Sequence, residues 1–303
     1  MCFLSPASRT SRSYDHVVDE FGRYGVWIRA SLWPTSPTEI ASTAAELESL
    51  GYGSVWLGAS PPDDLALPEA ILAATSRLVV GTSIIDIWVS DPVKLAASDA
   101  RVRAAHPGRF YLGLGSGHAP GAEAIGQRYV RPLSKLRGVL DALTDVPADE
   151  RMIAALGPKA LETARDLTAG ALPYLVPPAH TADARAILGP GKLLIPEQKV
   201  LLSTNETAAR AAARNHTAYY LKLPNYTNNL RRYGLTDEDF AGEGSDRWVD
   251  TLVVWGDERR VKEGVDAHFT AGADHVAVQI LAKTDKPGLP REEWRTIAKA
   301  LMS

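Results

Sequence analysis

The sequence predicts an α/β protein whose fold is a (β/α)8 TIM barrel with an insertion in its C-terminal half. From residue 23 onwards, apolar runs that read as strands alternate with segments of helical periodicity. The runs that begin near residues 24, 54, 78 and 110 are almost continuously apolar, as in strands buried on both faces of a parallel sheet. Seven or eight such units follow one another without a linker, which favours a single barrel over the alternative, an open Rossmann-type sheet.

The first half of the chain contains the clearest units. The apolar run YGVWIRA (24–30) is followed by SPTE (36–39), in which Ser36 can cap a helix, Pro37 suits its first position and Glu39 completes a capping box. Gly51 stands where that helix should end. The units that follow consist of the strands SVWLG (54–58), LVVGTSII (78–85) and FYLGLG (110–115) and of the helical segments 67–76 and 92–105.

The second half repeats this alternation less regularly. Its expected strands are RMIAAL (151–156), LPYLV (172–176), KVLL (199–202) and HVAVQIL (275–281), and a capped helix over 257–272 precedes the last of them. A polar and aromatic stretch over about 215–250 is too long for a bare loop, so we expect an insertion with helices of its own. Residues 1–22 lack a sustained period and are expected to be a poorly ordered N-terminal tail, which leaves 23–303 as a single barrel domain.

The composition restricts the classes of partner. Hydrophobic residues make up 45% and charged residues 23% of the chain, which is ordinary for a globular protein with a large core. The net charge is −3, and acidic and basic residues are interspersed along the chain. We therefore expect neither a nucleic acid nor a membrane surface as a partner. The single cysteine, Cys2, cannot form an internal disulfide, and no apolar run suggests a signal peptide or a membrane span, so we expect a cytoplasmic location.

Side chains at the carboxyl ends of the strands form the site of a barrel enzyme. The residues that directly follow the expected strands are Trp33, Ala59, Ser60, Ser83 to Asp86, Trp88 and the glycine run from Gly115 to His118. After the fifth strand comes LGPK (156–159), where a helix start offers free N–H groups to an anion. These residues also have ordinary structural interpretations, because tryptophans pack under loops, Ser and Asp cap turns, and Gly-Pro begins helices.

The run GLGSGHAPG (113–121) places four glycines and one histidine directly after an expected strand. So much glycine indicates a sharp bend or a very close approach, for which a bound ligand is one explanation. The run does not match the dinucleotide fingerprint, because His118 or Pro120 stands where the last glycine is required. Most histidines in proteins are structural hydrogen-bonding groups. His118, however, follows the end of an expected strand, and this position makes it the candidate acid or base.

Two common kinds of catalytic site are not indicated. The sequence contains no H-E-x-x-H metal motif and no G-x-S-x-G nucleophile motif. We therefore expect no metal site and do not favour a hydrolase. Glycines, tryptophans, an anion site and one histidine provide too little chemistry on their own, which predicts a bound cofactor.

Several longer stretches resemble the bacterial luciferase-like monooxygenase superfamily, and within it an actinobacterial branch of F420-dependent oxidoreductases. These stretches are HPGRFYLGLGSGH (106–118), VVGTSII (79–85), AALGPKALETARDLTAG (154–170), LPNYTNNLRRYG (223–234) and the closing FTAGADHVAVQIL (269–281). The resemblance implies a homodimeric (β/α)8 barrel that holds coenzyme F420, or alternatively FMN, at its C-terminal face.

The resemblance also implies positions for the site. A non-prolyl cis peptide at a bulge in the third strand would fall between Ser83 and Ile84, with its backbone against the tricyclic ring. The glycine run would lie beside the ribityl and phosphate chain, and LGPK around the phosphate. The residues expected to bind the cofactor are Ser60, Ser83, Ile84, Asp86, Gly115, Ser116, Gly117, Leu156, Gly157, Pro158 and Lys159.

Two departures from the sugar-phosphate dehydrogenases of this superfamily leave the substrate open. Ala59 and Ser60 stand where those relatives have an Asp-His pair, and His118 stands where they have a glutamate. We expect an oxidoreductase that exchanges a hydride between F420 and a small organic substrate, with His118 as the general acid or base and Trp33 and Trp88 lining the pocket. The alternatives are an FMN-dependent monooxygenase and a non-catalytic flavin-binding barrel.

Overall fold

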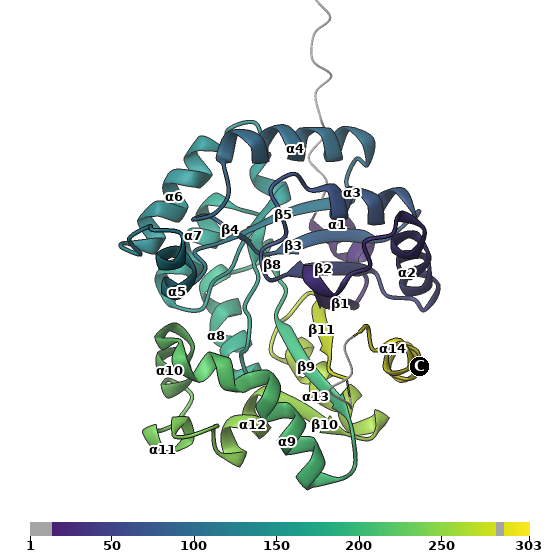
Figure 1. Ribbon diagram of the computed structural model, residues 1–303, viewed down its shortest axis with the longest axis vertical. Helices are drawn as coiled ribbons and strands as arrows, with labels where there is room; N and C mark the ends of the chain where they lie inside the picture. The colour runs from purple at the N-terminus through teal and green to yellow at the C-terminus, as the bar shows by residue number, and fades with distance from the viewer. Residues whose placement is uncertain (1–13, 283–287) are drawn as a thin grey trace, which may run out of the picture.

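A single parallel sheet organises the described part of the chain. The computed structural model describes residues 14–282 and 288–303. Figure 1 shows the strands gathered in the middle with helices around them. The strands are β1 (Tyr24–Arg29), β2 (Ser54–Gly58), β3 (Val79–Ser83), β4 (Ile85–Asp86), β5 (Phe110–Gly115), β6 (Arg151–Ile153), β7 (Gly170–Ala171), β8 (Leu193–Leu194), β9 (Glu197–Leu202), β10 (Val253–Gly256) and β11 (Val276–Ile280).

The pairing of these strands follows chain order and then returns to the first strand. It runs β1-β2-β3-β5-β6-β7-β8, and β11 pairs with both β9 and β1. Residues 195 and 196 lie between β8 and β9. The Ile195 amide donates to the Ala171 carbonyl of β7, and the Ala277 amide of β11 donates to the Pro196 carbonyl, both at 3.0 Å. The predicted parallel α/β sheet is confirmed, and its pairing is consistent with a barrel.

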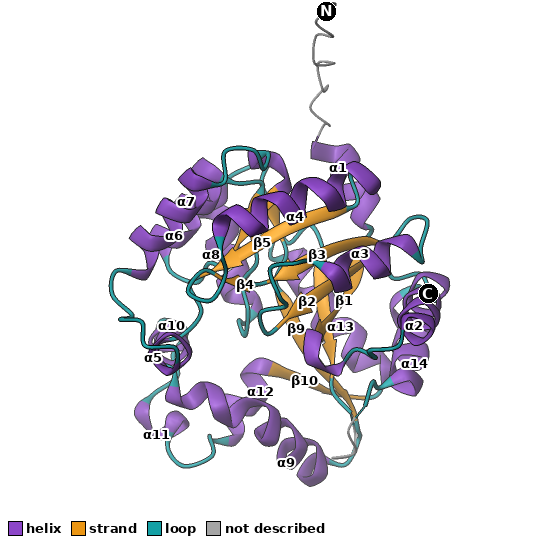
Figure 2. Ribbon diagram, turned by 45° about the horizontal axis from the view of Figure 1, so that its top comes forward, coloured by secondary structure: helices purple, strands orange, loops and turns teal. Residues whose placement is uncertain are grey.

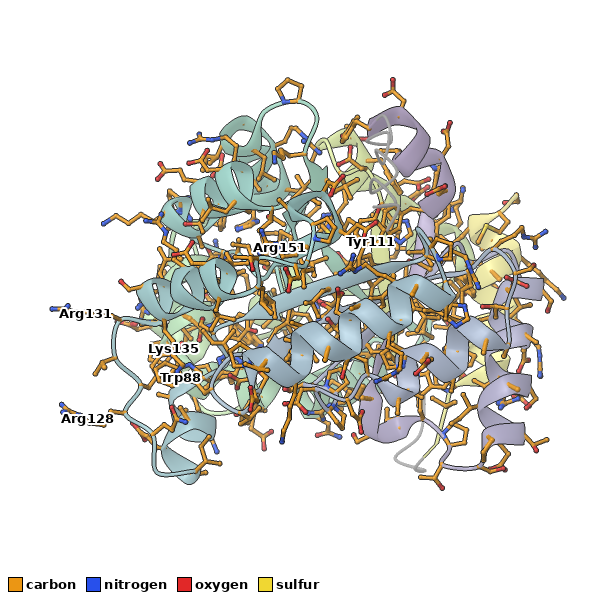
Figure 3. The ribbon with its side chains drawn as sticks, turned by 90° about the horizontal axis from the view of Figure 1, so that it is seen from above. Trp88, Tyr111, Arg128, Arg131, Lys135 and Arg151 are labelled. Carbon is orange, nitrogen blue, oxygen red and sulfur yellow. The ribbon has the colours of Figure 1, made fainter. Side chains whose placement is uncertain are left out.

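Alternate residues of the strands enter different hydrophobic clusters. On β1 and β2, Trp27 and Trp56 belong to a cluster with Tyr111, whereas Val55 and Leu57 belong to the large cluster that includes helix residues. Figure 3 shows Tyr111 in the middle of the molecule seen from above. Successive side chains of a strand point to opposite faces of the sheet. Because both faces of these strands are buried, their sequences are almost unbroken apolar runs.

Helices cover the sheet on the outside, as Figure 2 shows. The α2 helix begins at Pro37 as predicted, but the capping box at Ser36 and Glu39 is wrong, because the Ser36 side chain makes no capping hydrogen bond and Pro37 alone sets the first turn. The covering helices are α2 (Pro37–Ser49), α3 (Ala66–Ala73), α4 (Pro92–Ala105), α6 (Pro132–Ala142), α7 (Pro158–Leu167), α8 (Pro178–Leu188), α13 (Glu258–Thr270) and α14 (Arg291–Leu301). None of the helices described is long and apolar enough to cross a membrane.

Part of the expected N-terminal tail is helical. Helix α1 (Tyr14–Phe21) precedes β1, and Phe21 is buried. Its ring packs against Trp56 and Tyr111, with centroids 5.9 and 4.8 Å away. The first 13 residues of the expected tail lie outside the described residues.

The chain between β9 and β10 is mostly helical and lies to one side of the sheet, at the bottom of Figure 1. The expected insertion falls within this segment. Its apolar side chains form a second hydrophobic cluster together with Leu175, Leu201 and Leu281. Within the segment, the Trp248 indole donates to Thr217 Oγ1 at 3.1 Å. Its elements are α9 (Glu206–Thr217), a 3-10 helix η3 (Ala218–Lys222), α10 (Pro224–Arg231), α11 (Asp237–Phe240) and α12 (Asp246–Leu252).

Candidate active site

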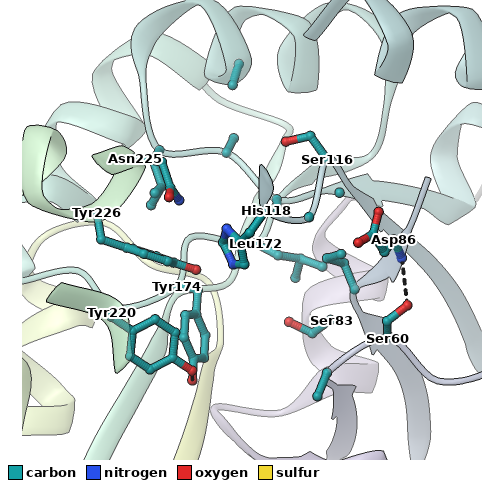
Figure 4. A pocket seen from close by; sticks show the side chains of 18 of the residues that line it. Ser60, Ser83, Asp86, Ser116, His118, Leu172, Tyr174, Tyr220, Asn225 and Tyr226 are labelled. Carbon is teal, nitrogen blue, oxygen red and sulfur yellow. Dashed lines mark hydrogen bonds between the residues drawn. The ribbon is translucent and has the colours of Figure 1, made fainter. Parts of the chain in front are cut away.

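A cavity of about 420 Å³ lies at the carboxyl ends of the strands (Figure 4). Residues from β1 to β7 line one side, and residues from η3 and α10 line the other. Its lining consists of Trp27, Arg29, Ala59, Ser60, Ser83, Ile84, Asp86, Gly115, Ser116, Gly117, His118, Ala154, Ala155, Leu156, Gly157, Ala160, Leu172, Tyr174, Tyr219, Tyr220, Asn225 and Tyr226. Nearly all the predicted cofactor residues and the predicted catalytic histidine therefore meet in one place.

The bulge between β3 and β4 contributes part of the wall. The peptide bond between Ser83 and Ile84 is cis, which confirms the prediction from the sequence. The Trp27 indole donates to Ser83 Oγ at 3.1 Å, and the Asp86 amide donates to Ser60 Oγ at 3.0 Å. The first bond holds the Ser83 side chain and the second holds the backbone at Asp86, on either side of Ile84, which lines the cavity.

The glycines in the second half of β5 and just after it are required by neighbouring protein atoms. A Cβ at Gly113 would lie 1.9 Å from the Thr82 carbonyl oxygen, and one at Gly115 would lie 2.5 Å from Ile84 Cγ1. Gly117 has φ +51°, and a Cβ there would lie 2.0 Å from Asp86 Oδ2. Every second residue of the run thus packs tightly against every second residue of the bulge. The sequence indicated a close approach, and these protein contacts account for it.

Asp86 provides a carboxylate at the cavity wall. Its Oδ1 accepts a hydrogen bond from the Trp88 amide at 2.9 Å. Burial raises the pKa of Asp86, and the bond from Trp88 and the charge of Lys135 oppose that rise. With one oxygen held by a backbone amide, the carboxylate is oriented to accept further hydrogen bonds from hydroxyl groups of a ligand.

His118 stands between the glycine run and α5 (Ala119–Ala124), in extended backbone conformation. Burial lowers its pKa below the usual 6.5, so the imidazole is neutral at pH 7. None of the described residues hydrogen-bonds its Nδ1, although that atom is buried. A neutral imidazole in this position can accept a proton and give it back once protonated.

Tyrosines form the wall that faces His118. The Tyr226 ring lies 5.5 Å from the His118 ring, and Figure 4 shows its hydroxyl turned towards His118 and Leu172. The Tyr174 and Tyr220 hydroxyls lie 2.7 Å apart, and Tyr174 donates to Gln279 Oε1 at 3.0 Å. Burial raises the pKa of Tyr226 well above its usual range, so its hydroxyl keeps its proton.

A buried ion pair supports this tyrosine wall. Lys199 and Glu197 are 1% and 3% exposed, and Lys199 Nζ lies 3.0 Å from Glu197 Oε1. The same ammonium lies 4.0 Å from the centre of the Tyr174 ring. Loss of either charge would leave the other buried and unpaired, so we expect the pair to be structural.

The start of α7 closes another side of the cavity. Gly157 is the N-cap residue of this helix, and a Cβ there would meet nothing within 4 Å. His180 Nε2 donates to the Leu156 carbonyl at 2.8 Å and so holds the turn in place. The free N–H groups of a helix start beside open space suit a phosphate. Pro158 and Lys159, which the sequence also suggested, do not line the cavity.

The two tryptophans expected to line the pocket do not line it. Trp33 is 5% exposed and belongs to the large hydrophobic core. Trp88 is 6% exposed, its indole donates to the Ser116 carbonyl at 2.8 Å, and its ring packs against Tyr129. Both tryptophans therefore have the structural role that their sequence positions also allowed, because burial of a large apolar ring beneath a loop is strongly stabilising.

The aromatic lining that the sequence did not identify comes from two places. Trp27 lies on β1, and Tyr174 follows β7 within the run LPYLV. Tyr219, Tyr220 and Tyr226 lie in the segment that the sequence already marked as polar and aromatic. That aromatic enrichment was the signal in the sequence that could have identified these three tyrosines as lining residues. The described residues contain no cluster of three or more His, Cys, Asp or Glu arranged to hold a metal ion.

Sequence comparison relates the chain to known enzymes. The family model of luciferase-like monooxygenases matches residues 21–152. A putative coenzyme F420-dependent oxidoreductase of Mycobacterium tuberculosis is 28% identical over 134 residues, which cover 43% of this chain and 39% of the relative. An F420-dependent glucose-6-phosphate dehydrogenase of Kribbella flavida is 27% identical over 133 residues, which cover 39% and 40%. The matched region spans less than half the length of these curated relatives.

Solved structures resemble the chain over most of its length. The coenzyme F420-dependent tetrahydromethanopterin reductase of Methanopyrus kandleri has a TM-score of 0.71 at 16% identity and covers 92% of this chain and 98% of its own. The FMN complex of the oxygenating constituent of 3,6-diketocamphane monooxygenase from Pseudomonas putida has a TM-score of 0.68 at 14% identity, with 92% and 97% covered. At these identities the likeness concerns the fold.

Proposed function

We propose that this chain, which is related to the luciferase-like monooxygenases over residues 21–152, is an oxidoreductase that exchanges a hydride between coenzyme F420 and a small organic substrate. The observation that carries the proposal is the single cavity in which the cis bulge at Ser83 and Ile84, the glycine run and the start of α7 meet a neutral histidine. The F420-dependent relatives support the choice of coenzyme.

The residues present fit such a coenzyme. The open space beside Gly157 leaves room for a phosphate at the helix start, and the unpartnered Nδ1 of His118 lies at the cavity wall. In this proposal Ile84 and the backbone around it face the ring, Ser60, Asp86, Ser116 and Gly117 bind the hydroxylated chain, and Leu156 and Gly157 bind the phosphate. The bound coenzyme supplies two-electron chemistry as hydride.

The protein then has to move one proton. A carbonyl substrate needs a proton when it accepts a hydride, and an alcohol must lose one when it donates a hydride. We assign that proton to His118. Its neutral imidazole takes the proton from an alcohol that donates a hydride, and in the reverse direction the protonated ring gives the proton to the carbonyl oxygen. The Tyr226 hydroxyl keeps its proton and can donate a hydrogen bond to the same substrate oxygen. Tyr174 and Tyr220 then pack against the rest of the substrate.

An FMN-dependent monooxygenase is the second candidate, because an FMN-bound monooxygenase shares the fold. Turnover distinguishes the candidates. The purified protein is loaded with F420 or FMN and screened against alcohols, ketones and alkenes, with and without oxygen. Oxygen-independent, substrate-dependent change in the F420 absorbance supports the first candidate. Oxygen-dependent turnover with FMN supports the second, and cofactor binding without turnover supports a non-catalytic barrel.

The remaining expectations are proposals of the same kind. We propose that the chain acts on a small molecule as a cytoplasmic homodimer, as the family resemblance implies. Sedimentation equilibrium of the purified protein tests the dimer, since a single species with the mass of one chain would contradict it.

A further inference from the structure

A basic segment without acidic residues joins α5 to α6 and continues into α6. Residues 124–140 contain Arg128, Arg131, Lys135 and Arg137 and neither Asp nor Glu. The chain as a whole has a net charge of −3, so this local excess is unlike the average surface. Positive charge concentrated beside a cavity raises the local concentration of anionic ligands.

Two hydrogen bonds attach this segment to the cavity wall, one directly and one through Trp88. The Tyr129 hydroxyl donates to the Gly117 carbonyl at 3.2 Å, and the Gln127 amide group donates to the Trp88 carbonyl at 3.3 Å. The Trp88 indole in turn donates to the Ser116 carbonyl at 2.8 Å. Ser116 and Gly117 line the cavity. The segment is therefore a rim of the cavity, positioned by the same residues that carry His118.

The cations of this rim are available to a ligand. Lys135 Nζ lies 4.5 Å from the centre of the Trp88 ring, and its charge opposes the rise that burial causes in the pKa of Asp86. Arg128 and Arg131 are exposed, and Figure 3 shows both side chains extending outwards at the edge of the molecule. Neither forms a salt bridge with a carboxylate in the described part of the chain, whereas Arg210 contacts Glu206, Asp246 and Asp250.

We propose that Arg128, Arg131 and Lys135, the basic rim, form a binding site for the oligo-γ-glutamate tail of coenzyme F420. This proposal rests on the proposed function. The tail extends beyond the coenzyme phosphate and carries at least one carboxylate per glutamate, and guanidinium groups match carboxylates in shape as well as in charge. FMN ends at its phosphate and would leave the basic rim unused, so the rim would favour F420 over FMN.

The test compares forms of F420 that differ only in the tail and includes FMN as a third ligand. Dissociation constants are measured by fluorescence for F420 with several glutamates, for F420-0, which has none, and for FMN, at about 0.05 M and about 0.5 M salt. For the wild type we expect the tail to tighten binding about 3–10-fold at low salt and far less at high salt, since exposed ion pairs are weak and screened. The double variant Arg128→Gln/Arg131→Gln should lose most of this gain and bind F420-0 as the wild type does. Arg77→Gln is the matched control, because Arg77 is exposed and stands before β3, at the other end of the strands.

Each outcome of these measurements either supports or overturns the basic rim as a binding site for the tail. A tail-dependent gain that the double variant loses and the control keeps supports the basic rim. Equal affinity for F420 and F420-0 in the wild type, or an unchanged gain in the double variant, overturns the rim and leaves the proposed function standing. Binding of FMN with no measurable binding of either F420 form overturns both.

Discussion

The rings of His118 and Tyr226 lie 5.5 Å apart at an angle of 54°, although the two residues come from opposite sides of the cavity. His118 follows β5, and Tyr226 lies on α10 in the helical segment after β9. A proton acceptor and a phenol that keeps its proton therefore face the same space. This arrangement suits a substrate oxygen that exchanges a proton with one group and is held by the other.

The first prediction concerns His118→Gln. Glutamine keeps a polar side chain of similar reach but cannot exchange a proton near neutral pH, so we expect kcat to fall about 10²–10⁴-fold. The affinity for F420 should remain nearly unchanged. Steady-state kinetics and a coenzyme titration of the same preparation check both values. Turnover within a few-fold of the wild type, or a loss of coenzyme affinity alone, would remove the proton-transfer role.

The second prediction concerns Tyr226→Phe. Phenylalanine keeps the ring that packs against His118 and removes only the hydroxyl, so we expect kcat/KM to fall about 5–30-fold, the cost of one hydrogen bond to the substrate. Tyr219→Phe is the matched control, because Tyr219 also lines the cavity but is 53% exposed. An equal effect in both variants would show that the Tyr226 hydroxyl has no special role.

The third prediction concerns the start of α7. Gly157 has φ −87° and open space at its Cβ position, so Gly157→Asp should fold normally. Its carboxylate would repel a phosphate at the helix start and weaken coenzyme binding by about 1–3 kcal/mol. Gly157→Ala should have a much smaller effect. Native-like melting with unchanged coenzyme affinity in the aspartate variant would place the phosphate elsewhere.

The fourth prediction concerns acid stability. Burial lowers the pKa of His180, His268 and His275 from 6.5 to about 4 in the folded chain. Below pH 6.5 the unfolded chain therefore binds more protons than the folded chain, and the free energy of unfolding should fall as the pH decreases towards 4. The steepest slope is about 1.4 kcal/mol per pH unit for each histidine. Urea unfolding at about pH 7 and about pH 5.5 measures the difference. Equal stability at the two values would contradict the burial of neutral imidazoles.

The sequence was a good guide wherever one local rule determined the structure. The strands β1, β2, β3 and β5 and the helix α4 lie where the apolar runs and the helical segment 92–105 placed them. Strand β10 was not predicted, because its four residues VVWG leave little periodicity to detect.

The site was predicted less completely, because its far side depends on packing between distant segments. Every strand-end residue expected at the cofactor lines the cavity except Pro158 and Lys159. Tyr220 and Tyr226 arrive through η3 and α10, whose position over the cavity no local pattern specifies. For the same reason, the choice between core and pocket for Trp33 and Trp88 could only be made in three dimensions.

The central claim is that the cavity binds coenzyme F420 in preference to FMN. Parallel equilibrium titrations of the purified wild-type protein with the two cofactors test it most directly. The account predicts saturable binding of F420 with one site per chain, weakened in Gly157→Asp, and much weaker binding of FMN. Saturable binding of FMN without binding of F420 would contradict it.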